Sequence, residues 1–402
     1  MKNIPEIRIK GFEGEWKEKQ LKDVCEVNPT TSVPDRFEYV DLESVVGTTM
    51  VKHRTEEKAT APSRAQRHAK YNDIFFQTVR PYQKNNYLFQ KKEDNYVFST
   101  GYAQLRANIN PEYLFIILQS TSFVNQVLLN CTGSNYPAIN PSALSNIDIN
   151  ITESDAEQQS LGSFFSSFDR LLSDHHRRLE NLRRVKKSML QKMFPQQGQT
   201  VPEIRFKGFS GEWEKAKLST FLEVSEEKNT DNFYGIEDVL SVSGDYGVVN
   251  QIEFQGRSFA GASVAGYGVA ETGDVIYTKS PLKSNPYGII KTNKGKPGIV
   301  SVLYGVYHPI KGRTDSSFVQ TYFESDARLN NYLRVLINKG SKNTLLISDE
   351  DALRGEVCFP SYEEQQRLSS FFTSLDNLIN DEVNYIDQLT RVKSTLLQKM
   401  FV

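Results

Sequence analysis

EQQSLGSFFSSFDRLLSDHHRRLENLRRVKKSMLQKMF, residues Glu157 to Phe194, recurs as EQQRLSSFFTSLDNLINDEVNYIDQLTRVKSTLLQKMF at residues Glu364 to Phe401. The two stretches are identical at 20 of 38 positions, with an offset of 207 residues. A second phrase is also duplicated, because PEIRIKGFEGEW (Pro5 to Trp16) and PEIRFKGFSGEW (Pro202 to Trp213) agree at ten of twelve positions. The 402 residues therefore form two tandem repeats, each with a shared head, a divergent middle and a shared tail.

The duplicated tail has the hydrophobic spacing of a long helix. Apolar residues follow alternating steps of three and four, which is the pattern of a coiled-coil seam, with polar His175 and Glu382 at one equivalent step. Neither copy contains proline, and Gly162 is the only glycine. The central seam positions of the two helices are Phe165, Phe168, Leu172, Leu179, Leu182, Phe372, Leu375, Ile379, Ile386 and Leu389.

A helix of this length cannot bury its seam alone, and the other copy is the obvious partner. We therefore predict an α+β fold in which two mixed α/β domains are separated by two long helices that form an antiparallel coiled coil with pseudo-twofold symmetry. The alternative is that each helix folds back onto its own domain. The predicted boundaries are 1–156 for the first domain, 157–194 for the first helix, 195–201 for a linker, 202–363 for the second domain and 364–402 for the second helix.

The two middles differ in sequence but share a pattern. NDIFF (Asn72 to Phe76) and GDVIY (Gly273 to Tyr277) both predict strands, and helical segments follow Pro111 and Asp326. A shared scaffold with different loops is typical of recognition domains.

Positive charge is concentrated in these middles, although the formal net charge of the chain is only −1. Residues 52–92 contain ten Lys or Arg and three acidic residues, and residues 257–313 contain eight and two. A basic run alone is often a solvated face, but two of them at equivalent places favour phosphate binding. Amide and arginine side chains within them could read base edges. The candidate DNA contacts are Arg64, Arg67, Lys70, Gln77, Arg80, Tyr82, Lys84, Asn85, Lys279, Ser280, Lys283, Ser284, Asn285, Tyr287 and Lys291.

Catalytic and metal-binding patterns are missing from the sequence. SNPYG at Ser284 to Gly288 is one proline short of an amino-methyltransferase tetrad, and no phosphate-binding G-x-x-x-x-G-K-[ST] is present. The five histidines have no metal-ligand spacing, so we predict no metal and no cofactor in this chain.

The three cysteines, Cys25, Cys131 and Cys358, form no C-x-x-C pair, which suits a reducing compartment. The start of the chain has no apolar signal segment, and no run of 18 apolar residues could span a membrane. We therefore expect a cytoplasmic protein without membrane contact.

The duplicated head PEIRxKGFxGEW and tail EQQ…LxxFFxSxD…RVKxxxLQKMF resemble the specificity subunit of type I restriction-modification enzymes over essentially the whole length. DIFFQTVRP in the first middle also resembles this family, and it makes Arg80 the best single candidate for transfer. The second middle has Pro281 near that place, so Lys279 or Lys283 would have to replace the arginine.

The resemblance implies a non-catalytic subunit in which each target recognition domain reads one half of a split double-stranded DNA site. The helices would set the spacing and bind two modification subunits, which bind S-adenosylmethionine and join restriction subunits in the full complex. Two alternatives stay open: a standalone DNA methyltransferase or nuclease, and a coiled-coil adaptor that binds only proteins.

Overall fold

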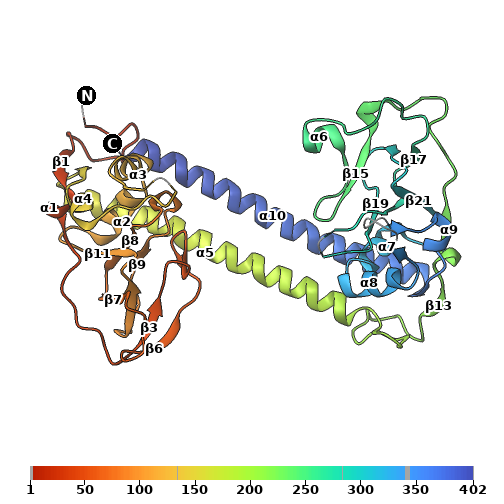
Figure 1. Ribbon diagram of the computed structural model, residues 1–402, viewed down its shortest axis with the longest axis horizontal. Helices are drawn as coiled ribbons and strands as arrows, with labels where there is room; N and C mark the ends of the chain where they lie inside the picture. The colour runs from red at the N-terminus through yellow and green to blue at the C-terminus, as the bar shows by residue number, and fades with distance from the viewer. Residues whose placement is uncertain (1–2, 134, 283, 340–344, 402) are drawn as a thin grey trace. The chain divides into compact units, whose positions relative to one another are not determined.

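The protein consists of two compact units, each of which contains segments from both repeats. The computed structural model describes residues 3–133, 135–282, 284–339 and 345–401. The first unit comprises residues 1–179 and 382–402, and the second comprises residues 180–381. The boundary between the two units therefore falls inside both long helices, α5 (Asp155–Lys192) and α10 (Tyr362–Met400). Figure 1 colours the chain by residue number, so that the two helices can be told apart.

Two four-stranded sheets form the framework of the first unit. One has the order β2-β11-β8-β9 and is antiparallel throughout, and the other, β6-β3-β10-β7, has one parallel pair between β3 and β10. The strands are β1 (Lys17–Gln20), β2 (Cys25–Val27), β3 (Arg36–Val40), β4 (Val45–Val46), β5 (Thr49–Met50), β6 (Arg54–Glu57), β7 (Ala65–His68), β8 (Asp73–Gln77), β9 (Tyr87–Leu88), β10 (Tyr96–Ser99), β11 (Tyr102–Ala107) and β12 (Asp148–Ile151).

Helices α2 (Pro111–Gln119) and α3 (Thr121–Leu129) replace the single helical segment expected after Pro111. Ser120 separates them because its backbone is extended and its side chain accepts a hydrogen bond from the backbone N–H of Phe123, which caps α3. The smaller helical elements are α1 (Leu21–Val24), the 3-10 turn η1 (Pro81–Gln83) and α4 (Pro141–Ser145).

The second unit repeats the central sheet of the first and replaces the rest. Its order β14-β21-β18-β19 matches β2-β11-β8-β9, and the pair β13–β24 matches β1–β12. The strands are β13 (Glu214–Lys217), β14 (Leu222–Val224), β15 (Leu240–Ser243), β16 (Gly247–Asn250), β17 (Gly268–Ala270), β18 (Val275–Thr278), β19 (Ile289–Thr292), β20 (Gly298–Val300), β21 (Tyr304–Pro309), β22 (Asn338–Lys339), β23 (Leu345–Leu346) and β24 (Glu356–Phe359). The helices are η2 (Leu218–Thr220), η3 (Ile236–Asp238), α6 (Gln251–Gln255), α7 (Ser316–Tyr322), α8 (Asp326–Arg334) and α9 (Asp349–Ala352).

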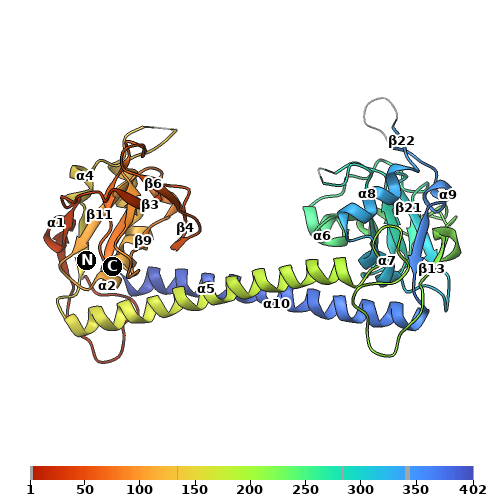
Figure 2. The same cartoon turned by 90° about the horizontal axis from the view of Figure 1, so that it is seen from below.

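In the first unit, the start of α5 lies against the end of α10, and the two run antiparallel (Figure 2). The rings of Phe165 and Phe401 have centroids 5.7 Å apart, and His175 Nδ1 lies 2.5 Å from Glu382 Oε1. As the residue number rises along α5, from Phe165 to His175, the number of the contacting residue in α10 falls, from Phe401 to Glu382. The two helices therefore run in opposite directions. The two polar seam positions predicted from the repeat thus contact each other.

In the second unit, the end of α5 pairs with the start of α10 in the same way. Lys186 Nζ lies 2.5 Å from Asp376 Oδ1, and the ring centroids of Phe194 and Phe372 are 5.8 Å apart. All ten predicted seam side chains are buried or half-buried. Each helix begins two residues before its predicted start and ends two before Phe194 or Val402. The predicted fold class is confirmed.

Each head phrase packs against the tail of the other repeat. Trp16 lies edge-on to Phe401 in the core of the first unit, and Trp213 lies edge-on to Phe194 in the core of the second. Both tryptophans are buried, which explains why the head and the tail are duplicated together.

Among the described residues, no helix is long and apolar enough to cross a membrane.

Candidate nucleic-acid interface

The turn between β10 and β11 brings two distant segments of the first basic stretch together. The backbone N–H of Thr100 donates to Arg64 O at 2.8 Å, and that of Thr78 donates to Gly101 O at 2.9 Å. The start of β7 and the end of β8 therefore lie on either side of this turn. Exposed Arg64 and Lys70 are at either end of β7.

Arg80 lies in the loop that leaves β8, next to a second loop around Tyr136. Its backbone N–H donates to Pro137 O at 2.8 Å, and its guanidinium carbon lies 4.4 Å from the centroid of the Tyr136 ring. Arg80 has φ = 54°, an uncommon conformation for a residue with a side chain. Strained residues of this kind cluster at functional sites, and Tyr136 is 63% exposed. We call Arg64, Arg80, Tyr82 and Tyr136 the Arg80 surface.

Gln77 and Asn85 support this loop from inside. Buried Gln77 donates from Nε2 to Val79 O at 2.6 Å and to Gln83 Oε1 at 2.9 Å. Asn85 Oδ1 accepts from the backbone N–H of Gly47 at 2.8 Å. Both side chains were predicted as DNA contacts, and the structure places them in internal hydrogen bonds.

Lys84 is held at the end of α2. Its Nζ donates to Gln119 O at 2.9 Å, and burial, followed by the charge of Lys393, lowers the pKa of Lys84. A cation at a helix C-terminus is favourable, so Lys84 has a structural role in the free protein.

Arg67 on β7 is the most distinctive cation of this unit. Its guanidinium Nε is buried without a hydrogen-bond partner, and burial lowers the pKa of Arg67. No carboxylate pairs with Arg67 in the part of the chain that the structure describes. A half-buried arginine without a partner is poised to accept an anion or a base edge.

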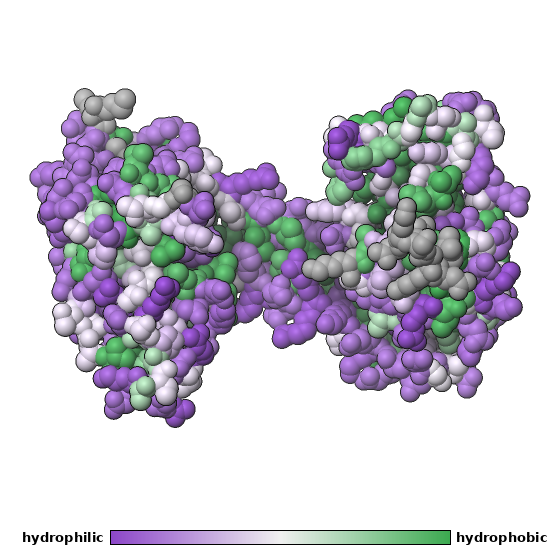
Figure 3. Space-filling view, viewed as in Figure 1, coloured by the Kyte–Doolittle hydropathy of each residue, from purple (hydrophilic) through white to green (hydrophobic). Residues whose placement is uncertain are grey.

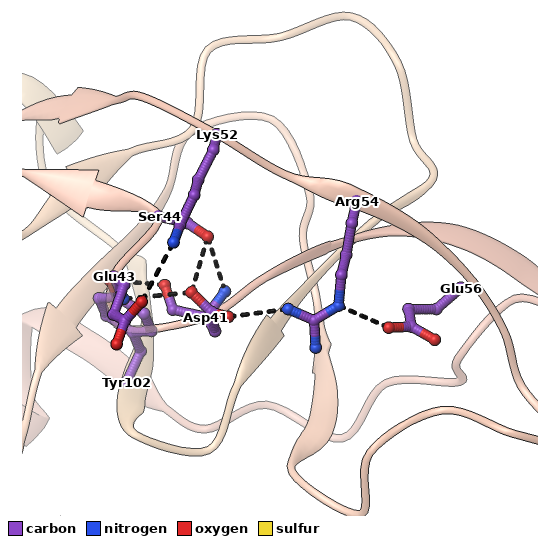
Figure 4. Close-up of polar contacts among 7 residues, drawn as sticks. All are labelled: Asp41, Glu43, Ser44, Lys52, Arg54, Glu56 and Tyr102. Carbon is purple, nitrogen blue, oxygen red and sulfur yellow. Dashed lines mark hydrogen bonds and ion pairs between the residues drawn. The ribbon is translucent and has the colours of Figure 1, made fainter.

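Acidic side chains neutralise the start of the basic stretch, which the sequence analysis missed. Figure 4 shows Arg54 between Asp41, at 2.9 Å, and Glu56, at 2.6 Å, while Lys52 reaches Glu43 at 3.1 Å. Burial alone would raise the pKa of Asp41, but hydrogen bonds from Ser44 and Arg54 lower it overall. The available signal was Asp41 and Glu43, which precede residue 52, together with Glu56 inside the stretch.

Internal contacts also occupy part of the second basic stretch. Lys279 Nζ lies 2.8 Å from Asp349 Oδ1, and buried Asn285 donates to Asp326 Oδ1 at 2.8 Å. The hydroxyl of exposed Ser284 donates to Asn285, and Tyr287 O accepts from the Tyr277 hydroxyl at 2.7 Å. Ser280 is half-buried at the start of this loop, and Lys283 lies outside the described residues.

Lys291 lies on β19, close to the long helices. Burial lowers the pKa of Lys291, and charges from Glu324, Lys186 and Asp376 act on it. Lys186 bridges Glu324 and Asp376 at 2.5 Å each. The charges that act on Lys291 therefore include those of the ion cluster around Lys186.

Exposed aromatic side chains around α6 are a further feature that the sequence analysis missed. Tyr246 and Phe254 have ring centroids 5.1 Å apart, and Arg257 lies 4.6 Å above the ring of Phe259. Figure 3 shows hydrophobic colour on the part of the second unit that contains α6. All three rings are exposed, and exposed apolar patches mark contact surfaces.

No group of three or more His, Cys, Asp or Glu that could hold a metal ion occurs among the residues that the structure describes. The exposed or half-buried cations of the first unit, Arg64, Arg67, Lys70 and Arg80, are of the residue types that contact phosphate and base edges in protein–DNA complexes.

The fold defines a protein of two repeated mixed α/β units, each completed by an antiparallel helix pair. Residues 13–184 match the family described as the type I restriction modification DNA specificity domain. The resemblance predicted from the duplicated phrases is confirmed.

One curated relative is the type I restriction enzyme HindI specificity subunit of Haemophilus influenzae. It is 25% identical over 162 residues, which cover 37% of this chain. The chain spans about a third of the length of that relative, 34%.

Two solved structures have a similar fold over nearly their whole length. The type I restriction-modification S subunit from M. genitalium has a TM-score of 0.63 and 13% identity, and the match covers 99% of each chain. A chain from a study of complex assembly and conformational transition of the type I R-M system has a TM-score of 0.52 and 20% identity, covering 96% of this chain and 97% of the other. At these identities the likeness concerns the fold.

Proposed function

We propose that this chain is the non-catalytic DNA-specificity subunit of a type I restriction-modification system. The observation that carries the proposal is the specificity-domain family match of the first unit, together with a second unit that keeps the same central sheet and changes the loops. In this function each unit reads one half of a bipartite double-stranded DNA target. The Arg80 surface, Arg67 and Lys70 contact one half, and the loop containing Ser280 and Ser284 contacts the other.

The paired helices set the spacing between the two half-sites and bind two modification subunits. The modification subunits supply S-adenosylmethionine and methyl transfer, and restriction subunits complete the assembly. A shared scaffold with different loops suits this division, because each loop set can read a different sequence while the helices and heads stay constant.

The test is to express the chain with its modification subunit and to map methylated sites across a genome. The proposal predicts one split motif with a fixed spacer. Replacing the Arg80 loop, residues 78–86, with a loop of different sequence should change which bases are recognised in only one half-site.

The purified chain alone, incubated with DNA and S-adenosylmethionine or with DNA and magnesium, distinguishes the enzyme alternative. Methyl transfer or cleavage without a second polypeptide would overturn the proposal. An adaptor that binds only proteins would show no duplex affinity under any salt condition.

A further inference from the structure

Gln77, at the end of β8, holds the loop of Arg80 from inside the first unit. The side chain of Gln77 is 2% exposed. Its Nε2 donates to Val79 O at 2.6 Å and to Gln83 Oε1 at 2.9 Å. One amide group therefore ties together residues that lie on both sides of Arg80 in the chain.

The two ends of the same loop are also joined by an amide. The backbone N–H of Gln77 donates to Asn86 Oδ1 at 2.8 Å, and the side chain of Asn86 is 1% exposed. Between these ends, the backbone N–H of Gln83 donates to Arg80 O at 3.0 Å and closes the 3-10 turn η1. The loop is therefore held at both ends and in the middle.

The conformation that these contacts hold is uncommon. Arg80 and Lys84, on either side of η1, each have φ = 54°, which is left-handed backbone. Pro81 follows Arg80, and a residue before proline avoids the ordinary right-handed helical conformation. Without the contacts around it, Arg80 would therefore favour extended backbone, and its side chain would point in a different direction. Strained residues persist only where the surrounding structure determines their conformation.

The second unit has neither the arginine nor the amides at the equivalent places. Tyr102, the first residue of β11, pairs with Gln77, and Tyr304, the first residue of β21, pairs with Thr278. In this register the equivalent residues are Thr278 for Gln77, Pro281 for Arg80 and Ile290 for Asn86. The buried amides therefore occur in the unit that has the arginine.

Stability alone does not explain the two buried amides. Gln77 Oε1 and Asn86 Nδ2 are buried without a hydrogen-bond partner among the residues that the structure describes. An unpaired buried polar atom is costly, whereas apolar groups of the same shape are nearly neutral. The second unit builds the same central sheet with Ile290 on β19. A positioning function explains why the first unit keeps the amides.

We propose that Gln77 is a positioning residue for DNA recognition, which holds Arg80 in its left-handed conformation so that the guanidinium meets DNA in one orientation. The inference rests on the proposed function, because it assigns a buried residue on which the recognition of one half-site depends. In this conformation the guanidinium carbon lies 4.4 Å from the ring centroid of Tyr136. Gln77 thus fixes the backbone of Arg80 and Tyr136 fixes the end of its side chain, which leaves little freedom to lose on binding.

The experiment measures the affinity of the full chain, assembled with its modification subunit, for the mapped DNA target. Gln77→Met removes both donated hydrogen bonds and keeps a side chain of similar size. We expect a loss of about threefold or more, which is part of the roughly 5–150-fold loss expected when the Arg80 contact is removed. In the Arg80→Ala background, Gln77→Met should have no further effect, because the residue that it positions is gone.

Gln83 provides a second variant on the exposed side of the loop. Gln83→Met removes the oxygen that accepts from Gln77 and should weaken target binding in the same way, again only while Arg80 is present. Gln126→Met, at an exposed glutamine of α3, is the matched control and should bind like the wild type. Fluorescence of Trp16, which lies in the core of the same unit, checks that each variant is folded.

The outcomes separate this inference from the function on which it rests. Target binding that Gln77→Met and Gln83→Met both leave unchanged would overturn the inference and leave the proposed function intact. Equal losses in the wild-type and Arg80→Ala backgrounds would also overturn it, because Gln77 would then act on the fold and not through Arg80. Failure of the wild-type complex to prefer any DNA sequence would overturn the proposed function itself.

Discussion

Arg8 and Glu157 form a bidentate ion pair inside the first unit. Arg8 Nε lies 2.7 Å from Glu157 Oε1 and NH2 lies 2.8 Å from Oε2, and the Glu157 side chain is 1% exposed. Arg205 and Glu364 repeat the pair in the second unit, at 2.7 and 2.6 Å. The glutamate that begins each EQQ sequence therefore joins the head phrase to the start of the long helix of the same repeat.

Arg8→Met should destabilise the first unit by about 3–5 kcal/mol, because it leaves a buried carboxylate without its partner. Urea denaturation followed by Trp16 fluorescence, in a Trp213→Phe background, measures this unit alone. Lys17→Met removes an exposed ion pair with Glu153 and serves as the control. Equal losses in the two variants would contradict the buried-pair interpretation.

The same pair predicts a pH dependence. Burial alone would raise the pKa of Glu157, but hydrogen bonds from Arg8 and Thr152 bring it below its ordinary value of 4.5. A lowered folded-state pKa contributes stability that is complete above pH 4.5 and is lost as the pH falls through the folded pKa. Acid titration of the urea midpoint should show this loss in the wild type. Glu157→Gln should have a shallower slope below pH 4.5, and an unchanged slope would contradict the assignment.

Gly162→Ala should destabilise the first unit, although alanine normally favours a helix interior by about 1 kcal/mol. A Cβ at Gly162 would lie 2.9 Å from Asn110 Oδ1 and 3.0 Å from Tyr113 N, both at the start of α2. We expect a loss of about 1–3 kcal/mol from this close approach. Thermal unfolding measures it, with Ser167→Ala on the exposed face of α5 as the control. If the variant were more stable than the wild type, α2 would have to shift away from the added methyl group at little cost, which would contradict the prediction.

The second repeat has Ser369 where the first has Gly162, and this difference shows what the sequence could predict. The duplicated phrases were sufficient for the repeat, the long helices and the seam, because those features depend on periodicity. The sequence did not reveal that Ser369 donates to Asp315 at 2.6 Å, while a Cβ at Gly162 would meet Asn110. Such contacts depend on how α2 and α7 approach the helices.

The candidate DNA contacts were harder to predict for the same reason. Composition identified the basic stretches, but it could not separate Lys279, which pairs with Asp349, from Arg67, which has a buried nitrogen without a partner. Nor could it indicate Tyr136, which lies 56 residues after Arg80 in the sequence and contacts it only in the fold. Contacts between residues that are distant in the sequence therefore decide which Lys and Arg side chains remain available to contact DNA.

Arg80 and Tyr136 provide the most direct test of DNA recognition. Arg80→Ala should weaken target binding by about 1–3 kcal/mol and relax one base position if the guanidinium reads a guanine. If it contacts only phosphate, affinity should fall for every sequence and the salt slope should decrease by about 1. Fluorescence anisotropy with the mapped target and with single-base variants separates the two outcomes, and Lys58→Ala, an exposed lysine of the same basic stretch, controls for loss of charge.

Tyr136→Ala should weaken target binding by roughly 2–5-fold, because the ring no longer holds the guanidinium in place. Tyr136→Phe keeps the ring 4.4 Å from the Arg80 guanidinium carbon and should bind like the wild type. In the Arg80→Ala background, Tyr136→Ala should have no further effect if the tyrosine acts only through the arginine. An additive loss in the double variant would instead mean that Tyr136 contacts the DNA itself, since its ring is exposed.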